Sequence, residues 1–382
     1  MENRIYFDNA ATTPLDKRAL DKMLPYLTEC FGNADSPHAF GRKAMGAVDE
    51  ARDTVASLIN ANKNEVYFTS GGTEADNWAV IGGAMAKRKE GRNEIVVSAI
   101  EHHAVLSAVE RLEKAGFVLR YLPVNAGGMV EISDIENAVN EHTAIVILMA
   151  ANNETGVLQP IKEAEKIAHK FGAFFFVDAV QYAPYKKIDV KEMNVDMLSF
   201  SAHKFHGPKG VGVLYVKNGV RIEKLVGGGE QERGLRGGTL NVAGIVGLAT
   251  AYQITCQEME ETNAKLLAFK SLFMEKLACV DGITRNGTGD NALPSVLNLR
   301  FEGVENTSFL FNMDLHGVCL AAGSACASAS VKPSHVLIAM GLTEREARQS
   351  VRFSFGKCNN EEEITRGAVL TAEFIKKLRE GK

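Results

Sequence analysis

Short apolar runs alternate with longer amphipathic stretches from Glu65 onward, and this alternation predicts an α/β fold. The expected strands are rich in Val, Ile and Phe, as in strands whose two faces are both covered. They lie at 65–70, 94–100, 117–123, 144–150, 173–178 and 197–201, and the helices between them lie at 74–89, 104–114 and 161–171. Parallel strands joined by helices form a doubly wound sheet with helices on both faces.

The pattern changes after residue 201. A strand at 210–216 follows its neighbour after a Gly-Pro-Lys connection too short for a helical crossover, so we expect it to run antiparallel and the mostly parallel sheet to be mixed. A long helical pattern from 241 to about 277 leads to strands at 295–301, 318–322 and 351–355, with a helix at 306–316 and a charged C-terminal helix. We therefore expect a large domain over 16–254 and a smaller α+β domain made of 1–15 and 255–382. Near the start, a helix is expected at 16–28 and a loop at 31–41.

Composition excludes several classes of function. The 382 residues are 46% hydrophobic, enough for a large core, and carry a formal net charge of -4 with no long basic run, which argues against nucleic acid as a partner. No apolar stretch approaches the roughly 20 residues that span a bilayer, and we expect a cytoplasmic protein without a membrane partner. Six scattered cysteines without a Cys-x-x-Cys pair argue against a disulfide framework and a structural zinc site.

Lys204 is the first candidate for chemistry. It follows the apolar run 195–200, inside a loop of Ser, His and Gly, where a solvated surface charge is not expected. Lysine amines form Schiff bases with carbonyl cofactors, of which pyridoxal phosphate is one. The alternative is a strand-end lysine before a Gly-Pro turn.

Asp178 is the second candidate, because it ends a strand that contains three consecutive phenylalanines. A carboxylate there is costly to ionise unless a cation faces it, and a protonated pyridine nitrogen is such a cation. The alternative is a helix N-cap. Asp178 and Lys204 are 26 residues apart, about one crossover between neighbouring strands, so both can meet at the edge of the sheet where α/β proteins bind ligands.

Other strand ends carry further candidates. In 69–77, Thr-Ser-Gly-Gly-Thr-Glu-Ala-Asp-Asn, Gly72 and Thr73 could contact a phosphate at the start of a helix, or they could belong to an ordinary capped helix. His102 could stack on an aromatic ring and shuttle protons. Metal binding by His102 together with His203 and His206 is disfavoured, since no carboxylate or cysteine with ligand spacing accompanies them. Asn153 places an amide at the same rim, unless it is a turn residue.

Three candidates lie later in the chain. The glycine-rich segment 227–239 ends in Thr239 and could hold an anion or cross a subunit interface, or it could be a flexible linker. Cys326 lies among small residues in Gly-Ser-Ala-Cys-Ala-Ser-Ala-Ser, where we expect it to be mobile and reachable, as a nucleophile must be. Arg352 lies in the middle of an apolar strand and needs an anion, for which a substrate carboxylate is a good candidate.

Taken together, these segments resemble the cysteine desulfurases of the NifS/IscS group, in the class V branch of fold-type I enzymes that use pyridoxal phosphate. The resemblance runs from Tyr-Phe-Asp-Asn-Ala-Ala-Thr-Thr-Pro at Tyr6 to Val-Arg-Phe-Ser at Val351. It implies that Lys204 binds the cofactor covalently, that Arg352 binds the substrate carboxylate and that Cys326 carries the persulfide. The resemblance also implies that Asp178 contacts the pyridine nitrogen, Gln181 the phenolic oxygen and His102 the ring, with Asn153 near cofactor and substrate. It places Thr73, Ser201 and His203 at the phosphate, where we also expect Gly72, and Thr239 at the phosphate of the neighbouring subunit.

The function that this resemblance implies is conversion of L-cysteine to L-alanine, with the sulfur held on Cys326 and donated for iron-sulfur cluster assembly and other thiolation pathways. It also implies a homodimer and a sulfur-acceptor or scaffold protein as partner, and we expect no metal, since no set of residues with ligand spacing is present. Lys204 would take the Cα proton and His102 would shuttle protons. Two alternatives are another class V enzyme, such as a selenocysteine lyase or an aminotransferase, and a non-catalytic sulfur carrier or scaffold of the same fold.

Overall fold

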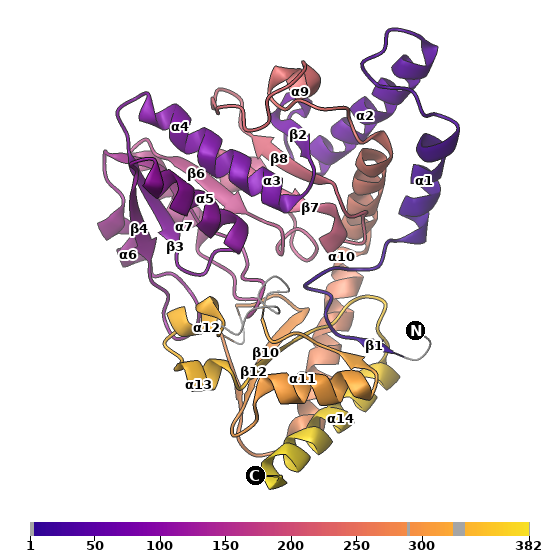
Figure 1. Ribbon diagram of the computed structural model, residues 1–382, viewed down its shortest axis with the longest axis vertical. Helices are drawn as coiled ribbons and strands as arrows, with labels where there is room; N and C mark the ends of the chain where they lie inside the picture. Colours follow the sequence, from indigo (N-terminus) through magenta and orange to yellow (C-terminus); the bar gives the residue numbers. More distant parts are fainter. Residues whose placement is uncertain (1–3, 289–290, 324–332, 382) are drawn as a thin grey trace.

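A computed structural model describes residues 4–288, 291–323 and 333–381 of the chain. Its main sheet has seven strands in the order β2-β8-β7-β6-β5-β3-β4 (Figure 1). The strands β3 to β7 run parallel to their neighbours among themselves, and β8 is antiparallel to both β7 and β2. The predicted mixed, mostly parallel α/β sheet is therefore confirmed. The strands are β2 (Val66–Thr69), β3 (Glu94–Ser98), β4 (Val118–Leu122), β5 (Thr143–Ile147), β6 (Phe174–Asp178), β7 (Met197–Ser201) and β8 (Gly212–Val216).

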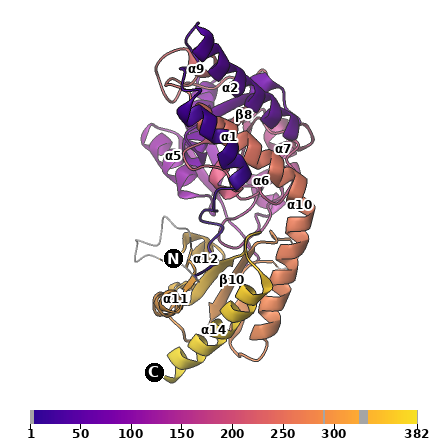
Figure 2. The same ribbon diagram turned by 90° about the vertical axis from the view of Figure 1, so that its right-hand side faces the viewer.

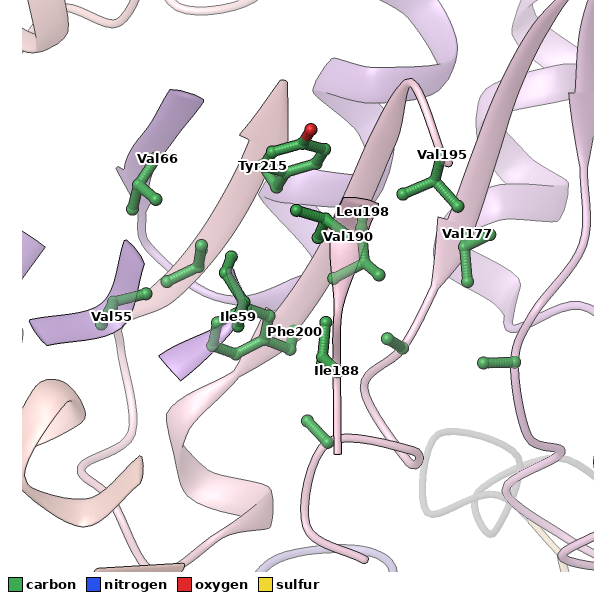
Figure 3. Close-up of a cluster of buried hydrophobic side chains, with 14 of the residues drawn as sticks. Val55, Ile59, Val66, Val177, Ile188, Val190, Val195, Leu198, Phe200 and Tyr215 are labelled. Atoms are coloured by element: carbon green, nitrogen blue, oxygen red, sulfur yellow. The ribbon is translucent and has the colours of Figure 1, made fainter. Parts of the chain in front are cut away.

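Helices cover both faces of this sheet because successive strand residues point to opposite sides. On one face, Val177, Leu198 and Phe200 pack with α2, α7 and α10. Figure 3 shows these three side chains in one cluster with Val55 of α2. On the other face, Phe176 and Met197 pack with the helical run from Gly72 to Arg88 and with α5. The helices of this part are α1 (Lys17–Thr28), α2 (Ala39–Leu58), α3 (Gly72–Asn77), α4 (Gly83–Arg88), α5 (His103–Lys114), α6 (Ile132–Ala138), α7 (Ile161–Lys170), α8 (Val190–Met193), α9 (Gln231–Gly234) and α10 (Val242–Leu277), with a π-helical turn at Trp78–Gly82 between α3 and α4.

The helix α2 is a feature that the apolar pattern did not predict, and it also shortens the loop expected at 31–41. It begins at Ala39, where the Nδ1 atom of His38 accepts a hydrogen bond from the backbone N–H of Gly41. Its buried face contains Val48 and Val55, but also Ala44, Ala47 and the charged Arg52, which weaken the pattern of large apolar residues by which buried helices are recognised.

A second, smaller part contains a three-stranded antiparallel sheet in the order β12-β10-β9 and a parallel pair, β1 with β11. Its core is aromatic: Phe7, Phe273 and Phe355 pack with ring centroids 4.9–6.2 Å apart. The elements are β1 (Ile5–Tyr6), β9 (Ile283–Arg285), β10 (Val296–Phe301), α11 (Asn306–Leu315), β11 (Val318–Cys319), α12 (His335–Ala339), α13 (Glu344–Ala347), β12 (Ser350–Ser354) and α14 (Glu361–Glu380).

The 36-residue helix α10 connects the two parts and runs along one side of the molecule (Figure 2). Its buried residues up to Tyr252 join the core of the large sheet, whereas those from Leu266 onward join the aromatic core. The domain boundary expected near residue 255 thus lies inside one continuous helix, and the division into two domains stays a prediction. Among the described residues, no helix combines the length and the apolar character needed to cross a membrane.

Candidate active site

One cavity gathers most of the candidate residues at the carboxyl ends of β6 and β7. Its volume is about 780 Å³, counting the open space at its mouth. Segments from the large sheet and β12 of the smaller part both contribute to its wall, as does the N-terminal stretch at Ala10 and Ala11. The sequence-predicted residues that line it are Gly72, Thr73, His102, Asn153, Asp178, Gln181, Ser201, His203, Lys204 and Arg352.

Lys204 lies in a short 3₁₀ turn, Ala202–Lys204, directly after β7. Its Nζ atom donates hydrogen bonds to the carbonyl oxygens of Ala10 at 2.6 Å and Ala11 at 2.9 Å. The side chain is half-buried and faces the cavity. An amine held at the wall of a ligand-sized cavity is suited to react with a carbonyl cofactor, and it is not the solvated strand-end lysine of the alternative interpretation.

Asp178 is buried at the end of β6, with 4% of its surface exposed. Its Oδ1 atom accepts a hydrogen bond of 2.8 Å from the backbone N–H of Val180. Burial raises the pKa of Asp178 above its ordinary value, while the backbone N–H and the charge of Lys204 oppose that rise. A carboxyl in this position would gain strongly from a cationic group bound in the cavity.

Two buried acids near this site were missed by the sequence interpretation. The Oδ1 atom of Asp76 accepts a hydrogen bond of 2.5 Å from Ser199, and Glu101 accepts bonds of 2.6 Å from Ser98 and from the N–H of Met149. Burial raises the pKa of Asp76 well above its ordinary value and that of Glu101 to about 8. Glu101 precedes His102 in the sequence, and this adjacency was the signal that could have found it.

The two histidines of the cavity are both uncharged near neutral pH. Burial and then the charge of Lys204 lower the pKa of His102 to about 4, and the same causes lower that of His203 to about 4. His102 is also the N-cap of α5, because its Nδ1 atom accepts a bond of 3.2 Å from the N–H of Ala104. With Nδ1 an acceptor, the neutral ring of His102 carries its proton on Nε2.

Small residues keep one end of the cavity open. Gly72 begins α3, and a Cβ atom placed there would lie 3.0 Å from Cγ2 of Val180 and 3.5 Å from Cβ of Ser201. Thr73 is exposed and follows Gly72 at the rim. A larger residue at position 72 would fill the space that a ligand phosphate needs.

Arg352 and its neighbours form the opposite wall. The Nη1 atom of Arg352 donates to the carbonyl of Asn153 at 2.9 Å, and its Nη2 atom donates to Oδ1 of Asp8 at 2.8 Å. The Nε2 atom of Gln181 donates to the carbonyl of Ala10 at 2.8 Å. Arg352 was predicted to need an anion, and the carboxylate of Asp8 is such an anion within the chain. The sequence interpretation did not identify Asp8.

Two predicted residues are not part of this cavity as described. Thr239 is exposed and lines no part of it. The segment that precedes Thr239 is anchored, since Arg236 forms a bidentate ion pair with Glu74 at 2.7 and 2.9 Å, so the flexible-linker alternative is not supported. Cys326 lies outside the described residues.

The residues of the cavity fit pyridoxal phosphate. The buried carboxyl of Asp178 suits its pyridine nitrogen, the amine of Lys204 suits its aldehyde, and the space beside Gly72 suits its phosphate. The neutral ring of His102 offers a flat surface against the cofactor ring.

Comparisons with known proteins point to the same chemistry. The family model described as aminotransferase class-V matches residues 5–366. A cysteine desulfurase IscS of Clostridium botulinum is 45% identical, over 100% of this chain and 96% of that protein. Among solved structures, a NifS-like protein has a TM-score of 0.92 and 36% identity, over 98% of this chain and 99% of the other. SspA in complex with cysteine has a TM-score of 0.82 and 36% identity, over 92% of this chain and 98% of the other.

Proposed function

This chain belongs to the class V aminotransferase family, and we propose that within the family it is a pyridoxal-phosphate-dependent cysteine desulfurase that converts L-cysteine to L-alanine. The observation that carries the proposal is the single cavity onto which Lys204, Asp178, His102 and Arg352 all open. The full-length similarity to proteins named for cysteine desulfuration favours this activity over selenocysteine lyase, aminotransferase and non-catalytic alternatives.

Lys204 would hold the cofactor covalently, and Asp178 would bind its pyridine nitrogen. Its phosphate would lie against Gly72 and Thr73 with Ser201 and His203, its phenolic oxygen against Gln181, and its ring against His102 and Asn153. When bound, pyridoxal phosphate supplies an electrophilic carbon and a ring that stabilises negative charge at the substrate Cα.

The chain's own residues then have defined tasks. Arg352 would bind the substrate carboxylate through a bidentate contact. Lys204, at the wall of the cavity, would take the Cα proton, and neutral His102 could donate the proton on its Nε2 and recover one afterwards.

Cys326 would complete the reaction. Its thiolate would attack the substrate sulfur, so that a sulfur–sulfur bond forms as the carbon–sulfur bond breaks. The electron pair of the broken bond would stay on the substrate carbon, which would gain a proton, so that the substrate leaves as alanine. The sulfur would remain on Cys326 as a persulfide. This segment has to deliver sulfur to an acceptor, and we propose an iron-sulfur scaffold or another thiolation protein for that role.

We also propose a homodimer in which Thr239 reaches the phosphate site of the other subunit. Supporting this, Thr239 is exposed although its segment is anchored by Arg236. Large apolar side chains are also exposed on α1 and in the segment that follows it, including Leu27 (59% exposed) and Phe31 (71%). A cytoplasmic location, where the cysteines stay reduced, is part of the same proposal.

The test of the activity is a balance of products. The purified protein loaded with pyridoxal phosphate should form alanine from L-cysteine in the absence of any keto acid, with one sulfur released to a thiol for each alanine. D-Cysteine and L-serine are the controls and should give none. Consumption of L-cysteine that requires a keto acid, and that yields the sulfur-containing oxo acid of cysteine with no sulfur released, would instead indicate an aminotransferase.

A further inference from the structure

The guanidinium of Arg352 is bound by a carboxylate from the N-terminal segment. Arg352 is almost fully buried, with 1% exposed, and lines the cavity beside Asn153 and Lys204. Its ion pair with Asp8 spans 2.8 Å, and the side chain of Asp8 is 19% exposed. A buried guanidinium needs such a partner, since an unpaired charge at this depth is strongly destabilising.

The carboxylate of Asp8 is carried on a rigid backbone. The N–H of Ser354 donates to the carbonyl of Phe7 at 2.8 Å, and the N–H of Asn9 donates to the carbonyl of Ser354 at 3.2 Å. The N–H of Ala10 donates to the hydroxyl of Ser354 at 2.9 Å. Asp8 therefore forms an isolated parallel bridge with Ser354, two residues beyond Arg352, and this bridge and the bond from Ala10 hold Asp8 at a fixed place.

The contacts of Arg352 leave room for a second carboxylate. A guanidinium has five N–H groups, and one bond each goes to the carbonyl of Asn153 and to Asp8. The Nε atom is buried and has no hydrogen-bond partner among residues 4–288, 291–323 and 333–381. The side chain is thus oriented by two fixed acceptors while part of its donor capacity remains unused.

We propose that Asp8 is a positioning residue for substrate recognition, which fixes the guanidinium of Arg352 so that its remaining N–H groups can bind the α-carboxylate of the amino-acid substrate. Preorganisation of this kind improves binding because a long side chain no longer has to be ordered when the ligand arrives. This inference rests on the proposed function, since the substrate-binding role of Arg352 is part of that proposal.

Asp8 should affect binding of the substrate carboxylate and not the later chemical steps. In the Asp8→Ala holoenzyme we expect KM for L-cysteine to rise about tenfold or more, with kcat within about twofold of wild type. Asp8→Asn keeps an acceptor but loses the charge, so its KM should rise less. The dissociation constant of L-alanine should rise in parallel with KM. Asp21→Asn removes the same charge at an exposed position outside the cavity and should change neither constant.

A substrate without the carboxylate separates this role from a general structural one. Wild type should prefer L-cysteine to L-cysteine methyl ester, Asp8→Ala should lose most of that preference, and Arg352→Gln should lose it. Adding Asp8→Ala to Arg352→Gln should then cause no further loss, because Asp8 acts through Arg352. If Asp8→Ala does not fold, Asp8→Asn with the same two substrates decides the question.

The proposed role of Arg352 and the proposed role of Asp8 are contradicted by different results. If Arg352→Gln leaves the preference for L-cysteine unchanged, the assignment of Arg352 in the proposed function is wrong. If Arg352→Gln abolishes the preference while both Asp8 variants keep wild-type KM values, the inference about Asp8 is wrong. A fall in KM in Asp8→Ala would also overturn it, because Asp8 would then compete with the substrate carboxylate.

Discussion

Asp178 and Ser199 are paired across the neighbouring parallel strands β6 and β7, and Lys204 follows five residues after Ser199. Asp178 and Lys204 therefore lie at one edge of the sheet and open onto the same cavity. One crossover connection is enough to place a buried carboxyl and a reactive amine together. The proposed chemistry depends on this pairing.

The first prediction concerns Lys204. Lys204→Ala should lose covalent attachment of pyridoxal phosphate and reduce alanine formation on the order of 1,000-fold or more, because the proposed base and anchor is removed. Borohydride reduction followed by peptide mass spectrometry measures the attachment. Lys209→Ala changes an exposed lysine nearby and should label as wild type does. Labelling of another lysine in wild-type protein would contradict the assignment.

The second prediction concerns the close approach of two backbones beside the cavity. A Cβ atom at Gly212 would lie 2.7 Å from the carbonyl carbon of Gly71, directly before α3. Gly212→Ala should therefore lower the free energy of unfolding by about 1–3 kcal/mol and speed cofactor release, since the residues before Gly72 must shift.

Gly46 provides the matched control for that substitution. It lies in α2, where an added Cβ would meet nothing within 4 Å. Gly46→Ala should raise the free energy of unfolding by about 0.5–1 kcal/mol through helix propensity and leave cofactor release unchanged. Urea unfolding and the rate of pyridoxal phosphate loss measure the two effects, and equal behaviour of the two variants would refute the steric argument.

The third prediction is a pH dependence in the cofactor-free protein. Burial raises the pKa of Glu101 to about 8, so the folded state keeps a proton that the unfolded state has released, and stability falls as pH rises toward 8. The lowered pKa values of His102, His203 and His206, about 4 each, have the opposite effect, which fades above about pH 6.5, where half of the histidine in the unfolded state has lost its proton.

The window from pH 6.5 to 8 is therefore where the buried acids contribute most to the pH dependence. Two other groups also make stability fall as pH rises: Asp76, and His169, whose pKa is raised by Asp196. The contribution of Glu101 is therefore measured as the difference in unfolding free energy between wild type and a Glu101 variant. Across this window wild type should lose up to about 2 kcal/mol more unfolding free energy than Glu101→Gln. The exposed Glu113→Gln should retain the wild-type slope, and a Glu101→Gln slope equal to it would exclude a proton held on Glu101.

The sequence predicted most of the fold because the central strands are buried on both faces and so appear as apolar runs, as in 173–178. It predicted the site where candidate residues end those strands, since strand ends of a parallel sheet meet at one edge. The helix α2 was missed because several alanines and a charged arginine, Arg52, interrupt the large apolar residues of its buried face.

Other features were inaccessible for different physical reasons. The contact between Asp8 and Arg352 joins residues 344 positions apart and depends on how the N-terminal segment lies along β12. Asp76 looks like an ordinary helix residue, and only the three-dimensional packing shows that it is a buried acid. The position of Glu101 beside His102 was a signal in the sequence, but its full burial is likewise a result of the packing. For Thr239, the predicted contact belongs to a second subunit.

Sulfur transfer through Cys326 is the central claim, and the cysteines offer a matched set of variants. Cys358 is exposed and free among the described residues, and it lies far from Cys326 in the sequence. Cys326→Ala should keep bound pyridoxal phosphate but lose alanine formation, because the sulfur has no nucleophile to attack it. Cys358→Ala should behave as wild type does.

The most direct measurement is to locate the sulfur by mass spectrometry. Wild-type holoenzyme is mixed with L-cysteine, its persulfides are trapped by alkylation, and its peptides are compared with those of Cys326→Ala. The account predicts one extra sulfur atom on the Cys326 peptide, in step with alanine released in the first turnover, and none in Cys326→Ala. Extra sulfur on a different cysteine of the wild type, or wild-type alanine formation by Cys326→Ala, would contradict it.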